Sequence, residues 1–214
     1  MKYELIIFDM DGTILDTLED LKNCTNHALR LHNMEERSLE EIRNFVGNGI
    51  RRLLEQAVAP GTSNDKLDTI QKDFRKYYDI HCTDFTKPYD GIIELIRELK
   101  NRGYKTAVVS NKVHEAVLDL CEQYFPGLFD LAIGEKSNVA RKPAPDMVHS
   151  ALEHFMVAKE NAVYIGDSDV DVATARNSKL DMIAVDWGFR SRECLIEQGA
   201  KIIVSQPEEI LHYV

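Results

Sequence analysis

Glu4-Leu5-Ile6-Ile7-Phe8-Asp9-Met10-Asp11-Gly12-Thr13, near the start of the chain, contains both the first expected strand and the first candidate site. The apolar run over 5–8, bounded by a glycine turn, predicts a buried strand. Open α/β sheets bind ligands at the carboxyl ends of their strands, where the aspartates would lie. Residues two apart in an extended chain point to the same side, so Asp9 and Asp11 can face one pocket. Two carboxylates this close together favour a bound cation or a shared proton.

The Asp-x-Asp-Gly segment has other interpretations when it is taken alone. Asp and Gly are common in turns, so the segment can also be only the end of a strand. It matches the start of a calcium-binding loop as well, but no helix precedes it and no glutamate closes such a loop. In a ligand site, Gly12 would let the backbone approach the bound group and Thr13 would add a hydroxyl.

The composition is that of an acidic globular protein. The chain has 214 residues, 44% of them hydrophobic, which suffices for one α/β domain with an insertion or for two modest domains. A net charge of -10 opposes binding to nucleic acids or anionic membranes. The sequence shows no signal peptide, no membrane-spanning apolar stretch and no zinc-ligand spacing among its cysteines and histidines. We therefore expect a soluble, cytoplasmic protein.

A helical block follows the first motif. Apolar residues recur at helical spacing from Leu18 onward, and no strand pattern interrupts them. Ser38 and Glu41 have the spacing of a capping box, which predicts where the second helix begins. Asn64 or Asp65 is expected to cap the fourth helix. The block is therefore predicted to be a small four-helix bundle.

The rest of the chain alternates between helices and strands, which predicts an α/β fold with a doubly wound parallel sheet. The expected domains are a core made of residues 1–15 and 85–214 and a helical domain made of residues 16–84. Because the insertion directly follows the paired aspartates, it would form a lid that excludes water from the site. A bundle that only packs against the core is the alternative.

Further polar residues stand at or near the ends of the expected strands. They are Ser110, Asn111, Lys142, Asp167 and Asp171. Carboxylates from two strands provide the oxygen ligands that Mg²⁺ prefers. The hydroxyl, the loop N–H groups and the lysine suit a tetrahedral dianion. Each feature is common by itself, since Asp167 or Ser168 can equally be a helix cap.

Together and in this order, these residues resemble the four motifs of the haloacid dehalogenase superfamily, whose core is Rossmann-like. The first motif, Asp-x-Asp-Gly-Thr, corresponds to 9–13, and the second, a strand-end serine or threonine, to Ser110. The third corresponds to Lys142 and the acidic fourth to 166–171. No part of the pattern is missing, which argues against a catalytically inactive member.

The resemblance implies phosphoryl transfer through an aspartyl-phosphate. Asp9 would be the nucleophile, and Asp11 would protonate the leaving oxygen and then activate water. Mg²⁺ would be held by the carboxylates of Asp9 and Asp167 and by the main-chain carbonyl of Asp11, with Asp171 nearby. The phosphoryl group would be bound by Gly12, Ser110, Asn111 and Lys142. Dehalogenases of the family lack the second aspartate of the first motif, so Asp11 favours a phosphatase.

The helical block resembles the family's small cap, and 46–49 with Arg51 is similar to the cap loop of phosphoglycolate phosphatases. Gly49, together with Arg51 or else its neighbour Arg52, would then bind a small carboxylate. Trp187 follows a strand in an aromatic-glycine turn similar to that subgroup's and is interpreted as a packing residue. The leading hypothesis is an Mg²⁺-dependent phosphoglycolate phosphatase, as a monomer or homodimer acting on a small phosphorylated metabolite. The alternatives are a β-phosphoglucomutase-like phosphotransferase, a related pyrophosphatase or nucleotidase, and a non-catalytic phosphate-binding module.

Overall fold

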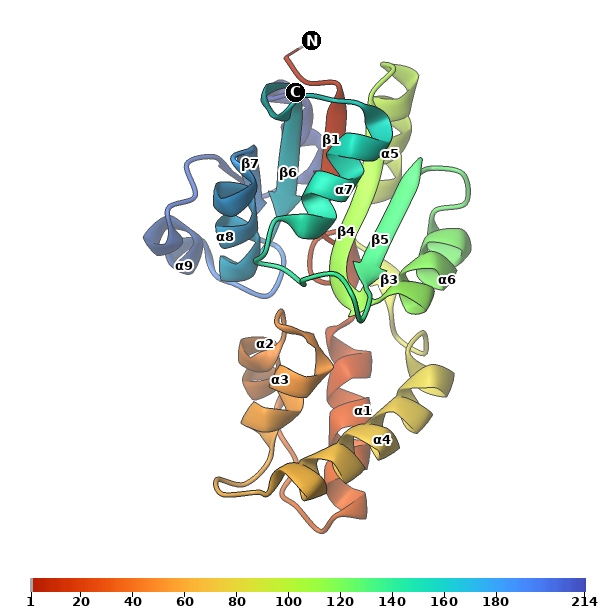
Figure 1. Cartoon of the computed structure of the whole chain (residues 1–214), viewed down its shortest axis with the longest axis vertical. Helices are drawn as coiled ribbons and strands as arrows, with labels where there is room; N and C mark the ends of the chain where they lie inside the picture. Colours follow the sequence, from red (N-terminus) through yellow and green to blue (C-terminus); the bar gives the residue numbers. More distant parts are fainter. Residues whose placement is uncertain (1) are drawn as a thin grey trace. The chain divides into compact units, whose positions relative to one another are not determined.

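The computed structural model describes residues 2–214 and divides the chain into two compact units (Figure 1). The first unit combines the segment up to Leu15 with Pro88–Val214, and the second is Asp16–Lys87. The sequence placed the second boundary after residue 84 rather than after Lys87. The short strands β2 (Leu15–Asp16) and β3 (Lys87–Pro88) lie where the chain passes from one unit to the other.

A six-stranded parallel sheet, in the order β5-β4-β1-β6-β7-β8, forms the centre of the first unit. Its strands are β1 (Leu5–Phe8), β4 (Lys105–Val113), β5 (Leu131–Glu135), β6 (Ala162–Gly166), β7 (Asp181–Val185) and β8 (Ile203–Val204). All four residues of β1 are buried, as expected for a central strand covered on both faces. The predicted doubly wound α/β fold is confirmed.

Helices cover both faces of this sheet. They are α5 (Ile92–Asn101), α6 (His114–Tyr124), α7 (Asp146–Phe155), α8 (Asp169–Ser178) and α9 (Arg192–Gln198), with short 3-10 helices at Lys159–Asn161 and Pro207–His212. Ile6 and Phe8 belong to a hydrophobic cluster shared with α5 and α6. Leu5 and Ile7 point the other way and belong to a cluster shared with α7 and α8. The alternation of side chains along one strand therefore supplies both halves of the core.

The second unit consists of four helices: α1 (Leu18–Leu31), α2 (Leu39–Phe45), α3 (Gly49–Ala57) and α4 (Asn64–His81). The capping box of Ser38 and Glu41 is confirmed. The prediction for α4 was wrong by one or two residues, because Ser63 is the cap and its hydroxyl accepts from the Lys66 N–H. In residues 2–214, no helix has both the length and the apolar content needed to cross a bilayer.

Strand β4 is longer than expected. The sequence placed Ser110 and Asn111 at its end, but the strand runs to Val113, and its pairing with β5 is interrupted by a change of register between Val109 and Val113. A register change of this kind bends a strand and redirects its side chains. The segment 110–112 therefore belongs to the strand and lies within its irregular part.

Candidate active site

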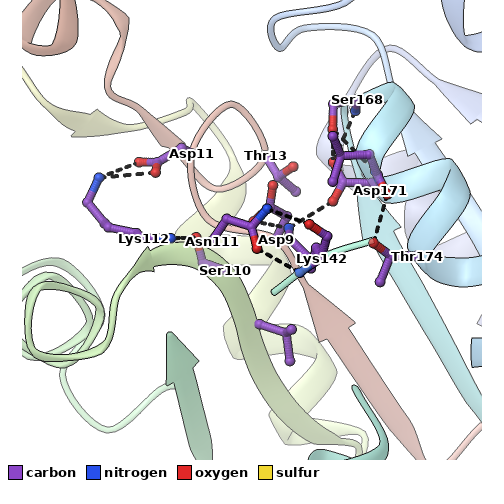
Figure 2. Close-up of polar contacts among 12 residues, drawn as sticks. Asp9, Asp11, Thr13, Ser110, Asn111, Lys112, Lys142, Ser168, Asp171 and Thr174 are labelled. Carbon is purple, nitrogen blue, oxygen red and sulfur yellow. Dashed lines mark hydrogen bonds and ion pairs between the residues drawn. The ribbon is translucent and has the colours of Figure 1, made fainter. Parts of the chain in front are cut away.

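The predicted site residues of the first unit come from adjacent strands. Strands β4, β1 and β6 are neighbours in the sheet and run parallel, so their carboxyl ends meet at one edge. Asp9 and Asp167 are buried just beyond the ends of β1 and β6, and Ser110 and Asn111 are buried in the last, irregular part of β4. Figure 2 shows the polar contacts around this edge.

Lys142 is the central cation of the site. Its Nζ lies 2.7 Å from Asp9 Oδ1 and 2.9 Å from Asp171 Oδ1. The same Nζ donates to the Tyr164 hydroxyl at 3.0 Å, and its side chain is 2% exposed. Burial alone would lower the pKa of Lys142, but the carboxylates of Asp171 and Asp9 outweigh burial and raise that pKa well above its usual value. Lys142 is therefore a permanent positive charge at this site.

Asn111 positions the loop that carries this lysine. Its Nδ2 donates to the carbonyl of Lys142 at 3.0 Å, and its Oδ1 accepts from the Lys142 N–H at 2.8 Å. The sequence predicted a phosphoryl contact for Asn111, and the structure adds this two-way hydrogen bond of its side chain. Ser110 lies beside it, and its hydroxyl accepts from the Lys112 N–H at 3.2 Å.

The two carboxylate oxygens of Asp171 contact different groups. Its Oδ1 accepts from Lys142 and from the Tyr164 hydroxyl at 3.1 Å. Its Oδ2 accepts from the main-chain N–H and the hydroxyl of Ser168, at 3.1 and 2.6 Å, in the capping box that begins α8. The start of α8 thus fixes a carboxylate of the site. Tyr164 was not among the residues that the sequence singled out.

Asp167 is held on one side by Thr13 and on the other by the loop that follows β7. Its Oδ1 accepts from the Thr13 hydroxyl at 2.8 Å and its Oδ2 from the Phe189 N–H at 2.8 Å. A Cβ added to Gly188 would lie 2.4 Å from Asp167 Oδ2, so only glycine allows this approach. Trp187 donates from Nε1 to the Thr13 carbonyl at 3.0 Å, which gives this residue a polar contact beyond packing.

The site has an excess of negative charge. Oxygens of Asp9, Asp167 and Asp171, all buried, lie within 4.8 Å of one another. Burial, and then the charge of Asp171, raise the pKa of Asp167 to about 7 and the pKa of Asp9 well above its usual value. Three carboxylates face one lysine, which leaves two negative charges unbalanced when all are ionised. A divalent cation with oxygen ligands, such as Mg²⁺, fits this donor set.

Asp11 has a different partner. Lys112 Nζ donates to Asp11 Oδ1 at 2.8 Å and to Oδ2 at 3.1 Å. The lysine side chain is 5% exposed and that of Asp11 is 21% exposed. Figure 2 shows this pair to one side of the Asp9, Lys142 and Asp171 contacts. Lys112 was missed at the sequence level, although its place directly after Ser110-Asn111 at a strand end was a usable signal.

The two candidate substrate contacts of the helical domain lie in the second unit. Gly49 begins α3 with a φ of 79°, a conformation that favours glycine. The Arg51 guanidinium forms ion pairs with Glu55 and Asp68 inside that unit. Roles for Gly49 and Arg51 in substrate binding stay predictions.

Comparison with known proteins shows which sequences the chain resembles. The sequence pattern of a family described as "Haloacid dehalogenase-like hydrolase" matches residues 6–185. A phosphoglycolate phosphatase of Aquifex aeolicus (strain VF5) is 31% identical over 210 residues, which cover 97% of this chain and 94% of that protein. A candidate pyrophosphatase, PpaX, of Caldanaerobacter subterraneus subsp. tengcongensis is 29% identical over 217 residues, which cover 100% of this chain and 96% of that protein.

Solved structures show the same similarity in three dimensions. A candidate phosphoglycolate phosphatase from Lactobacillus delbrueckii subsp. bulgaricus has a TM-score of 0.95 at 40% identity, covering 100% of this chain and 98% of that one. A candidate phosphatase from Clostridium acetobutylicum has a TM-score of 0.89 at 25% identity, with the same coverage. These similarities extend over the residues of both compact units.

Proposed function

We propose that this chain hydrolyses the phosphate ester of a small metabolite and forms a phosphorylated Asp9 on the way. The chain belongs to the haloacid dehalogenase-like hydrolase family and is a phosphatase of that family. The observation that supports the proposal most directly is the Lys142 ammonium 2.7 Å from Asp9 Oδ1, beside an acidic cluster that fits a divalent cation. Attack of a carboxylate on a phosphate dianion brings two anions together, so catalysis needs positive charge at this point.

In the first step, a carboxylate oxygen of Asp9 attacks phosphorus and forms a new P–O bond. The bond between phosphorus and the ester oxygen breaks, and its electron pair stays on the leaving oxygen, which takes a proton from Asp11. Lys142 and the donors at the end of β4, near Ser110 and Asn111, would hold the phosphoryl oxygens.

In the second step, Asp11 takes a proton from water while the water oxygen attacks the phosphorus of the phosphorylated Asp9. The P–O bond to Asp9 breaks, its carboxylate is restored, and inorganic phosphate leaves. Asp11 therefore returns to its protonated state at the end of each cycle.

Mg²⁺ is the proposed cofactor. The carboxylates of Asp9 and Asp167 and the main-chain carbonyl of Asp11 would hold the ion, with Asp171 beside them. When bound, it would neutralise part of the charge of the carboxylates and of the phosphoryl group. Thr13 and the Phe189 N–H keep the Asp167 carboxylate in place for this role.

Phosphoglycolate is the first substrate to test, because relatives of that name are about 30% identical to most of this chain. Pyrophosphate is the second, because the PpaX relative is 29% identical over its length. Both are small and carry a further anionic group beside the phosphoryl group that would be transferred. We propose a cytoplasmic enzyme of small-molecule metabolism.

The test is phosphate release with Mg²⁺ from phosphoglycolate, pyrophosphate, sugar phosphates, nucleotides and p-nitrophenyl phosphate. Each assay is repeated with EDTA and with the Asp9→Asn variant, whose fold is checked by circular dichroism. The proposal expects turnover that both controls abolish. Wild-type turnover in Asp9→Asn would refute the nucleophile. Conversion of glucose 1-phosphate to glucose 6-phosphate without phosphate release would indicate a mutase instead.

A further inference from the structure

Lys112 and Asp11 form a nearly buried ion pair at the edge of the site. Both oxygens of the Asp11 carboxylate accept from Lys112 Nζ, at 2.8 and 3.1 Å. The exposed fraction of the lysine side chain is only 5%. An ammonium this far from water is costly to leave without an anionic partner. Lys112 is therefore a fixed cation whose partner can be exchanged for another anion but not simply removed.

This pair stands apart from the charges around Asp9. Lys142 contacts Asp9 and Asp171, whereas Lys112 contacts Asp11 (Figure 2). In the described part of the chain, the cluster of carboxylates within 4.8 Å of one another contains Asp9 but not Asp11. The side chain of Asp11 is thus attached to its own cation rather than to the group that would receive phosphorus.

We propose that Lys112 determines specificity for substrates whose leaving group carries an anion close to the ester oxygen, either a carboxylate or a second phosphate. The substrate anion takes over N–H donors of Lys112. The Asp11 side chain, released from the ion pair, takes a proton from solvent and can then donate it to the leaving oxygen. This inference rests on the proposed hydrolase function and names the substrate class of the same site.

The geometry gives a physical reason for the selection. An ester oxygen that reaches Asp11 comes within a few ångströms of Lys112 Nζ, because the two side chains are in hydrogen-bond contact. A carboxylate two bonds from that oxygen can reach the ammonium. An uncharged leaving group cannot replace the Asp11 carboxylate as an anionic partner, so it does not offset the ion-pair energy that is lost when Asp11 leaves Lys112. Anionic leaving groups avoid this cost.

The first experiment uses the wild-type enzyme and compares phosphoglycolate with its uncharged isostere, phosphoglycolamide. The inference expects kcat/KM to be about 10- to 100-fold higher for the acid, the range of one charge-assisted hydrogen bond. Pyrophosphate is compared with p-nitrophenyl phosphate in the same way. The two comparisons together show whether Lys112 favours a carboxylate or a second phosphate on the leaving group. Equal kcat/KM values in both pairs of substrates would overturn the inference even if no variant could be made.

The second experiment replaces the lysine. In Lys112→Met, kcat/KM for phosphoglycolate should differ from kcat/KM for phosphoglycolamide by less than about threefold. Lys112→Arg should keep part of the wild-type preference for the acid, because arginine keeps the charge. The matched control is Lys105→Met, at the start of the same strand, where Nζ donates to the Phe155 carbonyl. A Lys112→Met ratio equal to that of the wild type would show that the ion pair is only structural.

Failure of the hydrolase proposal and failure of the Lys112 inference give different results. If the folded wild-type enzyme releases no phosphate from any substrate, p-nitrophenyl phosphate included, the hydrolase proposal is refuted and this inference falls with it. If it hydrolyses uncharged and anionic esters equally well, the hydrolase proposal stands and the role of Lys112 is refuted.

Discussion

At the scale of single residues, the carboxylates of Asp171 and Asp167 are each held by more than one neighbour. Asp171 accepts from Lys142 and from Ser168, and Asp167 accepts from Thr13 and from the Phe189 N–H. Groups fixed in this way lose little freedom when a substrate binds, which is the general requirement for electrostatic catalysis. Two substitutions test how much the site depends on this fixation.

Lys142→Met should destabilise the first unit and abolish turnover. It leaves Asp9 and Asp171 buried without their cation, and breaking a buried pair in this way costs about 3–5 kcal/mol. The loss, measured by urea unfolding, should be larger at pH 8 than at pH 5. Burial raises the pKa of Asp9, so its carboxyl group takes up a proton, and loses the uncompensated charge, more readily as the pH falls. A loss that is the same at both pH values would contradict the charge explanation.

Gly188→Ala should weaken metal binding more than it weakens the fold. The added Cβ would lie 2.4 Å from Asp167 Cβ, from Asp167 Oδ2 and from the Gly12 carbonyl, so the carboxylate must shift. Crowding of this kind costs about 1–3 kcal/mol. The measurement is the rise in melting temperature produced by Mg²⁺, which should shrink. Gly199→Ala is the control: its Cβ would meet no atom within 4 Å, but its φ of 99° strains alanine, so it should destabilise the fold without changing the Mg²⁺ effect. An unchanged Mg²⁺ effect in Gly188→Ala would show that this loop does not position Asp167.

At the scale of elements, helix starts and strand ends do the positioning. The capping box of α8 is also the contact that fixes Asp171, so local helix formation and the charged cluster share one side chain. The irregular end of β4 carries Ser110, Asn111 and Lys112, and pairing with β5 resumes at Val113. Bulged strand ends often redirect side chains next to active sites.

The start of α4 provides a test at this scale. Ser63→Ala should lower the free energy of unfolding by about 1 kcal/mol, because the hydroxyl accepts from the Lys66 N–H at the first turn. Asn64→Ala is the matched control and should change it by less than about 0.5 kcal/mol. Asn64 lies inside the helix, and the hydrogen bond that its Oδ1 accepts from Arg51 is long, at 3.3 Å, and exposed. Thermal or urea unfolding of the two variants decides between them. The opposite order would mean that Asn64 is the cap.

At the scale of the whole molecule, the buried acidic cluster links folding to metal and to pH. Burial, with the charge of Asp171, raises the pKa of Asp167 to about 7, against about 4 for an unfolded chain. Between these values the folded state binds more protons than the unfolded state, so this group lowers stability as pH rises from about 4 to 7. A bound cation would compensate for the same charge.

Removal of metal should therefore have a pH-dependent effect. In EDTA, the ionisation of Asp167 should lower the melting temperature as the pH rises towards 7. Mg²⁺ should remove this decrease. At about 100 times its dissociation constant, a ligand of the folded state adds about 2.7 kcal/mol. Below pH 7 the apparent Mg²⁺ affinity should fall, because protons compete for Asp167. A melting temperature that does not respond to Mg²⁺ at pH 8 would refute a metal site at Asp9, Asp167 and Asp171.

The sequence by itself determined the α/β class, the helical insertion and most of the polar residues that gather at the carboxyl edge of the sheet. These follow from signals that act over a few residues: the apolar run before Asp9, the helical spacing after Leu18, and the capping box at Ser38. The ends of β1 and β6 could be placed as well, because polar residues follow these buried strands directly, whereas the end of β4 could not. The family resemblance then connected Asp9, Lys142 and Asp167, which no local pattern relates.

Only the tertiary structure decided which side chains meet. Lys112 and Asp11 are 101 residues apart, and Thr13 and Asp167 are 154 apart, yet each pair is in hydrogen-bond contact. Asn111 likewise reaches Lys142 across 31 residues. Such pairings depend on the order of strands in the sheet and on the register of an irregular strand end. Neither is set by the sequence within a helix or strand, because both result from the balance of packing over the whole core.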